Sequence, residues 1–215
     1  MSSQKQLDVP PVPNLGTSGA AYSQEVQNQN NGTLRLFFIK LLNAVQALTA
    51  RVGGKYINFP FGAFQSLVDQ PIASANTAYA MTLDTTDFSN GVTTSNSSRI
   101  NVANAGLYNL QWSGQFVNTD TQIHDSSVWI RINGTNLTGS TGFLSIPNSH
   151  GGVDGHLIVG WNYFLQLAQN DYVELYWSAT NTAISLQHFA AQTSPTRPST
   201  ASLIVTMTFV SNLPD

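Results

Sequence analysis

The sequence predicts an all-β fold, a sandwich or jelly roll of antiparallel sheets, preceded by an extended arm and one helix. From residue 55 onward, apolar residues alternate with polar ones or form short runs, and no helical period interrupts them. Turn-forming residues separate these runs, and Asn133-Gly134 between two apolar stretches is the strongest hairpin signal. Short strands without intervening helices are typical of two packed sheets. We expect strands at residues 56–61, 78–83, 99–102, 107–116, 128–132, 157–167, 172–177, 184–189 and 203–210.

The composition indicates a packed core under a weakly charged surface. Of the 215 residues, 41% are apolar and 10% aromatic, which is not the composition of a disordered chain. Only 9% are charged, so 78 Asn, Gln, Ser and Thr residues must cover most of the surface. A net charge of -3 without any Lys/Arg-rich run argues against a general nucleic-acid binder. We expect the four tryptophans to pack in the core or in a subunit contact; they are Trp112, Trp129, Trp161 and Trp177.

The lack of cysteine removes several chemistries at once. It excludes a disulfide scaffold, a thiolate zinc site and a cysteine nucleophile. Stability must therefore come from packing, including packing between subunits.

Residues 1–32 are expected to form an extended N-terminal arm. Proline and glycine recur between residues 10 and 19, and Gln and Asn dominate residues 24–31, with few large apolar residues to anchor a core. We therefore expect an arm that becomes ordered when something binds it. The start MSSQKQLDVPPVP has no apolar stretch behind a basic end, so we expect no secretory signal and synthesis in a cytoplasm.

A helix is expected within residues 33–54, with Thr33 as its N-cap and Gly53-Gly54 as its stop. Apolar residues at alternating spacings of four and three form a heptad seam, typical of helices that pack on their own copies. A membrane span would need about 20 predominantly apolar residues. Charged and amide residues interrupt this run, so we expect self-association or docking and no membrane span. The seam consists of Leu34, Phe38, Leu41, Val45, Leu48 and Val52.

Several segments, in their order along the chain, resemble C1q/TNF-like domains. Residues 99–116, RINVANAGLYNLQWSGQF, resemble the strand-turn-strand in which a Gly-x-Tyr opens a long core strand. Residues 165–177, LQLAQNDYVELYW, resemble the hairpin in which a Gly-Asp turn precedes an aliphatic strand, with Asn170 where Gly is usual. Residues 128–135, VWIRINGT, together with 191–199, AQTSPTRPS, are more narrowly similar to C1q-like proteins of tailed bacteriophages.

The resemblance spans residues 33–212, and in the phage group a helix with a start like Leu34-Arg35-Leu36 also precedes the domain. It implies a ten-stranded jelly roll at residues 55–215 that trimerises about a three-fold axis, in a protein of the virion. The collagen-like stem of animal relatives is absent, and the heptad helix takes its place. We therefore expect a homotrimeric surface appendage, a head decoration or a head or tail fibre, anchored through its arm and helix to a capsid or tail protein.

Two other functions stay open. The distal loops of the jelly roll could bind a host surface glycan or protein, which would make the protein an adhesin. The remote alternative is a hydrolase of envelope polysaccharide, although the sequence marks no pair of carboxylates for glycoside cleavage. A Gly-x-Ser-x-Gly elbow and a phosphate-binding loop are also missing. We expect no enzymatic activity, no catalytic residue and no cofactor.

The sharpest candidate for metal chemistry is the segment HGGVDGH, residues 150–156. Its two imidazoles and one carboxylate, from His150, Asp154 and His156, could bind a divalent ion such as zinc if the loop folds back on itself. The alternative is a polar loop that caps a strand, or histidines that meet their copies near a trimer axis. No fourth ligand is evident, so we expect no bound metal.

Two further polar features lie in loops, one before the strand expected at 203–210 and one before the strand expected at 128–132. Arg197, between Pro195 and Pro198, could form a fork with a carboxylate of a neighbouring subunit or of a host glycan. Ordering of the entry to the last strand is the structural alternative for this loop. The loop before residue 128 carries a weaker set, for which we expect solvated polarity rather than catalysis: Asp120, His124 and Asp125.

Overall fold

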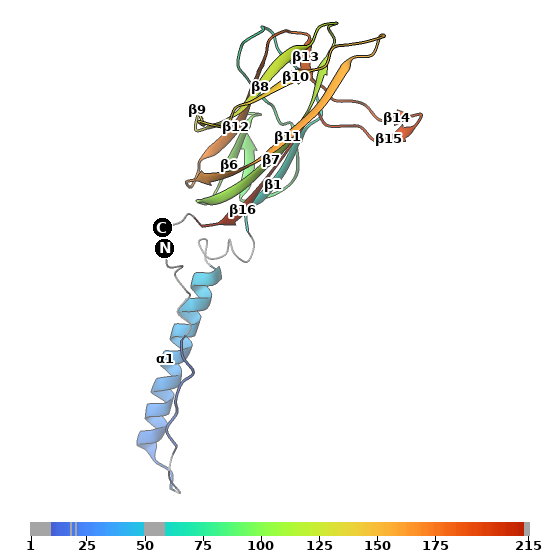
Figure 1. Ribbon diagram of the computed structural model, residues 1–215. Coiled ribbons are helices and arrows are strands. Elements are labelled where there is room, and N and C mark those ends of the chain that lie inside the picture. Colours follow the sequence, from blue (N-terminus) through green and yellow to red (C-terminus); the bar gives the residue numbers. More distant parts are fainter. Residues whose placement is uncertain (1–9, 18, 20, 50–58, 213–215) are drawn as a thin grey trace. The chain divides into compact units, whose positions relative to one another are not determined.

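The computed structural model describes residues 10–17, 19, 21–49 and 59–212, which belong to two compact units. The first unit contains the N-terminal segment and helix α1, and the second, from Pro60 to Leu213, contains a β-sandwich (Figure 1). The described residues are thus mostly β, with two antiparallel sheets preceded by one helix. This confirms the predicted fold class at the level of an all-β sandwich with an N-terminal helix.

Helix α1 spans Gln24–Thr49 and begins earlier than Thr33, so the predicted N-terminus was wrong. Ser23 caps it: the Ser23 hydroxyl accepts from the Val26 N–H at 3.4 Å. Thr33 lies inside the helix, where its hydroxyl donates to the Gln29 carbonyl at 3.0 Å. The Gln/Asn run is helical because Gln is a good helix former and a serine cap precedes the run. The predicted stop at Gly53-Gly54 lies outside the described residues.

The arm has a partner in its own chain, which the sequence did not predict. Residues 10–17 are extended and run beside α1 (Figure 1). The Asn30 side chain fixes them by accepting from the Gly16 N–H and donating to the Gly16 carbonyl, both at 2.9 Å. The described arm is therefore held by two hydrogen bonds to a helix side chain.

The sandwich consists of two sheets, which we call sheet A and sheet B, and a small separate hairpin. Sheet A contains β1 (Phe61–Ser66), β2 (Gln70–Pro71), β4 (Thr85–Asn90), β7 (Gly106–Asn118), β11 (Gly155–Leu167), β13 (Ile184–Leu186) and β16 (Leu203–Ser211). Sheet B contains β3 (Tyr79–Ala80), β5 (Val92–Ser95), β6 (Arg99–Val102), β8 (His124–Ile132), β9 (Thr135–Asn136), β10 (Gly142–Ile146) and β12 (Tyr172–Ala179). The hairpin consists of β14 (Gln192–Thr193) and β15 (Thr196–Arg197).

Eight strands, which we call the main strands, pair in a nested order; β4, β5 and the strands of two or three residues are set aside. Strand β8 pairs with β10, β7 with β11, β6 with β12, and β1 with β16, all antiparallel. The first main strand is thus beside the last, the second beside the second from last, and so on inward. Between these pairs the chain crosses repeatedly from one sheet to the other, as in a long hairpin rolled into two layers.

Most predicted strands are present, and the hairpin at Asn133-Gly134 is confirmed, with positive φ values of 50° and 80° between β8 and β9. Strands β4, β5 and β10 were missed, as were the two-residue strands β2, β9, β14 and β15. Strand β4 carries one large apolar side chain, Phe88, which is 62% exposed, so its pattern resembles a loop. Residues 56–58 of the strand predicted at 56–61 lie outside the described residues, and the first described strand begins at Phe61.

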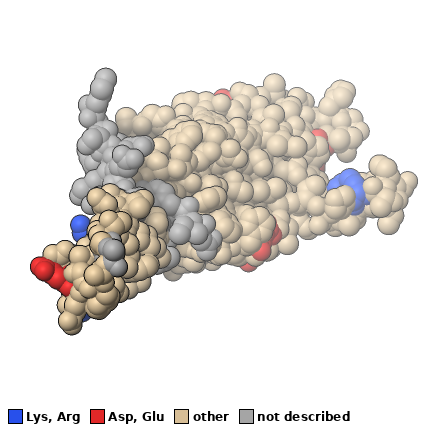
Figure 2. Space-filling view, turned by 90° about the horizontal axis from the view of Figure 1, so that it is seen from below, with Lys and Arg blue, Asp and Glu red and all other residues tan. Residues whose placement is uncertain are grey.

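Both sheets contribute large side chains to one core. Trp112 and Phe116 of β7 and Trp177 of β12 are buried, and the Phe116 and Trp177 rings contact edge to face with centroids 5.7 Å apart. Trp161 is partly buried and stacks on Trp112 at 5.7 Å, whereas Trp129 faces outward on β8. The prediction of core packing is thus confirmed for every tryptophan except Trp129. The surface seen in Figure 2 is almost entirely uncharged, in accord with the composition.

Tyr108 gives the core a measurable pH dependence. Its side chain is buried and donates to the Asn104 carbonyl at 2.8 Å, and burial raises the pKa of its hydroxyl from 10.0 to about 12. Because the folded-state pKa is raised, the protonated hydroxyl contributes to the free energy of unfolding. That contribution is complete below pH 10.0 and falls as the pH rises toward about 12. Between about pH 9 and 11, the wild type should lose about 1.4 kcal/mol more unfolding free energy than Tyr108→Phe. Urea unfolding at both pH values measures this, and equal losses would contradict it.

Candidate functional site

The predicted heptad seam is present on α1 as far as the structure describes it. Leu34, Leu41 and Leu48 are half-buried, whereas Phe38 and Val45 are 60% and 45% exposed. Val52 lies outside the described residues. Off-seam apolar side chains are exposed as well: Leu36, Ile39 and Leu42. The seam therefore carries apolar surface that its own arm does not fully cover, and whether it trimerises or docks stays a prediction.

The structure does not assemble the candidate metal ligands. The backbones of His150 and Val153 bond to each other in both directions, at 2.8 and 3.1 Å, and close a tight turn over the two glycines. His156 lies on β11 and contacts the Phe189 ring edge-on at 5.4 Å. Within the described residues, no group of three or more His, Asp or Glu side chains is placed to hold a metal ion. The segment is a β-turn leading into a strand, as the structural alternative had it.

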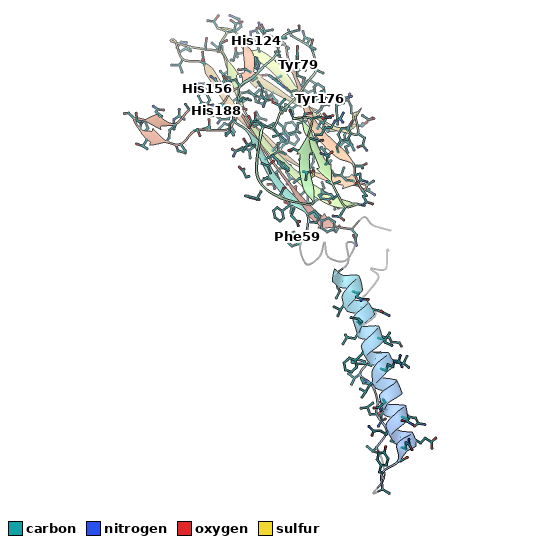
Figure 3. All side chains as sticks on the ribbon, turned by 180° about the vertical axis from the view of Figure 1, so that it is seen from behind. Phe59, Tyr79, His124, His156, Tyr176 and His188 are labelled. Carbon is teal, nitrogen blue, oxygen red and sulfur yellow. The ribbon has the colours of Figure 1, made fainter. Side chains whose placement is uncertain are left out.

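The weaker polar set is only partly brought together. His124 Nε2 and Asp120 Oδ2 are 2.8 Å apart, and this hydrogen bond is the main reason that the pKa of the Asp120 carboxyl lies below its usual value. Asp125 instead accepts from the Ser145 hydroxyl at 2.6 Å, across strands β8 and β10. The Asp120–His124 pair closes a loop at the start of β8, where Figure 3 labels His124.

Arg197 lies in the β14–β15 hairpin, which extends away from the body of the sandwich (Figure 1). Its Nε donates to the Gln192 Oε1 at 2.8 Å, so the guanidinium is fixed within the hairpin. Among the described residues it forms no ion pair. The predicted contact of Arg197 with another subunit or a ligand stays a prediction.

The most organised polar cluster lies on the outer face of sheet B, and the sequence reasoning missed it. Figure 3 shows Tyr176, one of its members, on the other side of the sandwich from His156 and His188. Alternate residues of β8 and β12 point outward, because the intervening ones are buried in the core. We call the cluster the Arg–Tyr face; it consists of Arg99, Trp129, Arg131, Tyr172, Glu174 and Tyr176.

Three rows of side chains make up the Arg–Tyr face. In the middle row, Glu174 is opposite Arg131 in the register of β8 and β12, and its Oε1 is 3.8 Å from Arg99 Nε. The two guanidiniums lean toward the rows on either side. Arg131 Cζ is 4.4 Å from the centroid of the Tyr176 ring, and Arg99 Cζ is 4.2 Å from the centroid of the Tyr172 ring. Each arginine is thus held by a cation–π contact.

Trp129 and Glu174 complete the cluster and are both fixed. The Trp129 indole N–H donates to the Asn136 Oδ1 at 3.0 Å, and its ring lies beside Tyr176 with centroids 6.0 Å apart. Glu174 is only 6% exposed although it points outward, and it accepts from the Ser98 hydroxyl at 2.7 Å. The charged neighbours therefore cover a carboxylate on the surface of the sheet.

The charges on the Arg–Tyr face are unequally compensated. Arg99 pairs with Glu174, whereas Arg131 forms no ion pair within the described residues and donates to the Gly134 carbonyl. Arg131 Nε is buried and has no hydrogen-bond partner there. A signal was present in the sequence: the outward positions of the strands at 128–132 and 172–177 carry aromatic and charged residues at every second place. It was missed because the neighbours across the strands were not known.

Comparison of the sequence with protein-family models and with curated proteins finds no match. In the described part of the chain, no helix is both long and apolar enough to cross a membrane.

Proposed function

We propose that this protein is a structural component of a tailed-phage virion, a homotrimeric appendage that attaches through its arm and helix and displays the sandwich. The nested strand pairing supports a jelly roll, because pairing of first with last and second with second from last is how that fold is wound. This is the fold that the C1q/TNF-like resemblance implies. The role is architectural, without a catalytic step.

The observation that carries the proposal is the outer face of sheet A. Strands β1, β7, β11 and β16 contain no Lys, Arg, Asp or Glu, and the one such residue in the described strands of sheet A is Asp87 on the edge strand β4. A solvent-facing sheet normally alternates core residues with polar and charged ones. A wide uncharged face is instead typical of a surface that is covered by another subunit.

Exposed apolar side chains on that face also support the proposal. Ile158, Phe164 and Ile204 alternate with core residues, and they are 70%, 58% and 45% exposed. Asn109 Oδ1 on β7 is buried and lacks a hydrogen-bond partner within the described residues. A copy of the chain packed here would cover these apolar groups. The exposed part of the heptad seam on α1 would add a second self-association surface.

Two measurements test the proposal. Light scattering on the full chain should give a native mass near three times 23.2 kDa. Mass spectrometry of purified particles from the phage that encodes the chain should find it in the virion, in a copy number divisible by three. A monomer at every concentration contradicts the trimer, and absence from purified particles contradicts the virion role.

A further inference from the structure

The Arg–Tyr face has the rigidity of a preformed binding surface. Arg99 and Arg131 are each stacked on a tyrosine ring, Trp129 is held by Asn136, and Glu174 is held by Ser98. All of these side chains stand on β-strands or the turns beside them. A ligand that binds here would not have to order the side chains first, which lowers the entropic cost of binding.

The charge of this face favours an anionic ligand. The sandwich, residues 60–212, contains only three Lys or Arg residues, and two of them, Arg99 and Arg131, are on this one face. They surround a single carboxylate, so the face has one positive charge in excess. Arg131 carries that excess, because Arg99 is the arginine paired with Glu174. Arg131 Nε is buried and one terminal N–H donates to the Gly134 carbonyl, so the two terminal nitrogens are the edge left for a two-pronged contact with a ligand carboxylate.

The aromatic part of the face favours a sugar ring beside that carboxylate. Trp129 and Tyr176 are half-exposed, tilted by 35°, and adjacent to Arg131. Large, rigid, amphipathic rings provide contact area at a low entropic cost. The nearest outward neighbours along β8 and β12 are Ser127 and Ser178, the outward positions of these strands carry no aliphatic side chain, and the exposed ring of Phe143 on β10 lies opposite Ser127. Hydroxyls around flat rings match a ligand with hydroxyls and a flat apolar face better than an apolar protein segment.

We propose that the Arg–Tyr face binds an acidic oligosaccharide, with a pyranose ring on Trp129 and Tyr176 and a uronate carboxylate on Arg131. The inference does not depend on the trimer or on the virion role. It assigns recognition to the face of sheet B, whereas the adhesin alternative used the distal loops.

Isothermal titration of the full-length protein tests this with three probes. They are hexagalacturonate, its fully methyl-esterified form, and a hexaglutamate peptide that has the carboxylates without the rings. Hexagalacturonate should bind, and both other probes should bind at least about tenfold more weakly. No heat of binding with hexagalacturonate at about 10 mM would overturn the proposal. Equal binding of the ester would exclude the role of Arg131, and equal binding of the peptide would indicate an acidic protein partner instead.

Variants locate the site. Trp129→Ala and Arg131→Gln should each weaken hexagalacturonate binding at least about tenfold, and Arg131→Lys, which keeps the charge but loses the fork, should weaken it less. Arg35→Gln is the matched control, because it removes an exposed guanidinium from helix α1, outside the sandwich, and should leave binding unchanged. Circular dichroism and the melting temperature verify that each variant is folded. Binding that survives Trp129→Ala and Arg131→Gln, or that is lost in Arg35→Gln, overturns the assignment.

Discussion

Replacing Ile204 with aspartate is expected to convert the proposed trimer into a monomer. Ile204 points outward from β16, which lies between β1 and β7 near the middle of the uncharged face of sheet A. In a trimer packed through this face, each subunit would bury one carboxylate without a cationic partner, since the four main strands provide none. Burial of an unpaired charge costs several kcal/mol per group, about enough to exceed the net affinity of many interfaces. Light scattering should give a mass near 23.2 kDa.

A matched control separates dissociation from misfolding. Phe143 on β10 is 83% exposed and belongs to sheet B, so Phe143→Asp should remain trimeric. Ile204 is 45% exposed in the single chain, so the variant should fold, with unfolding free energy changed by about 1 kcal/mol or less. A folded Ile204→Asp that keeps the native mass of the wild type would contradict the assignment of this face. Dissociation of Phe143→Asp would shift the interface to sheet B.

The sequence was sufficient for the fold class and for the strands that contribute most to the core. Period-two alternation locates β7, β11 and β16, because their inward positions are filled by large apolar residues. Strands at the edges of the sheets, such as β4 and β5, face solvent on most positions and lose that signal. The start of α1 was missed for a different reason. Its cap is Ser23, but the amide-rich first turns resembled an unstructured arm, and the apolar seam begins only at Leu34.

Candidate sites were harder to predict than the fold, because they depend on which residues become neighbours across strands. His150 and His156 are close in sequence, yet a tight turn followed by a strand separates their roles. The Arg–Tyr face shows the converse. Arg99, Arg131 and Glu174 come from three segments far apart in the chain, and only the register of β6, β12 and β8 brings them into one row. The pattern of each strand, read by itself, does not show which residues of another strand lie opposite.

Trp177→Ala is expected to be the most destabilising of the tryptophan replacements, at about 3 to 5 kcal/mol. Trp177 is 1% exposed on β12 and contacts Phe116 on β7, so its ring connects the two sheets across the core. Its loss leaves a cavity that the strands cannot close without breaking their ladders.

Trp129→Ala is the matched control: it removes the same side chain from the neighbouring strand but from the outer face, and should cost about 1 kcal/mol. Urea unfolding at one fixed protein concentration measures both, since association would otherwise alter the apparent stability. Equal losses in the two variants would mean that Trp177 does not join the sheets. Because a domain of this size is stable by only about 5 to 15 kcal/mol, the predicted loss would remove a large share of the total and should be visible as a lower melting temperature.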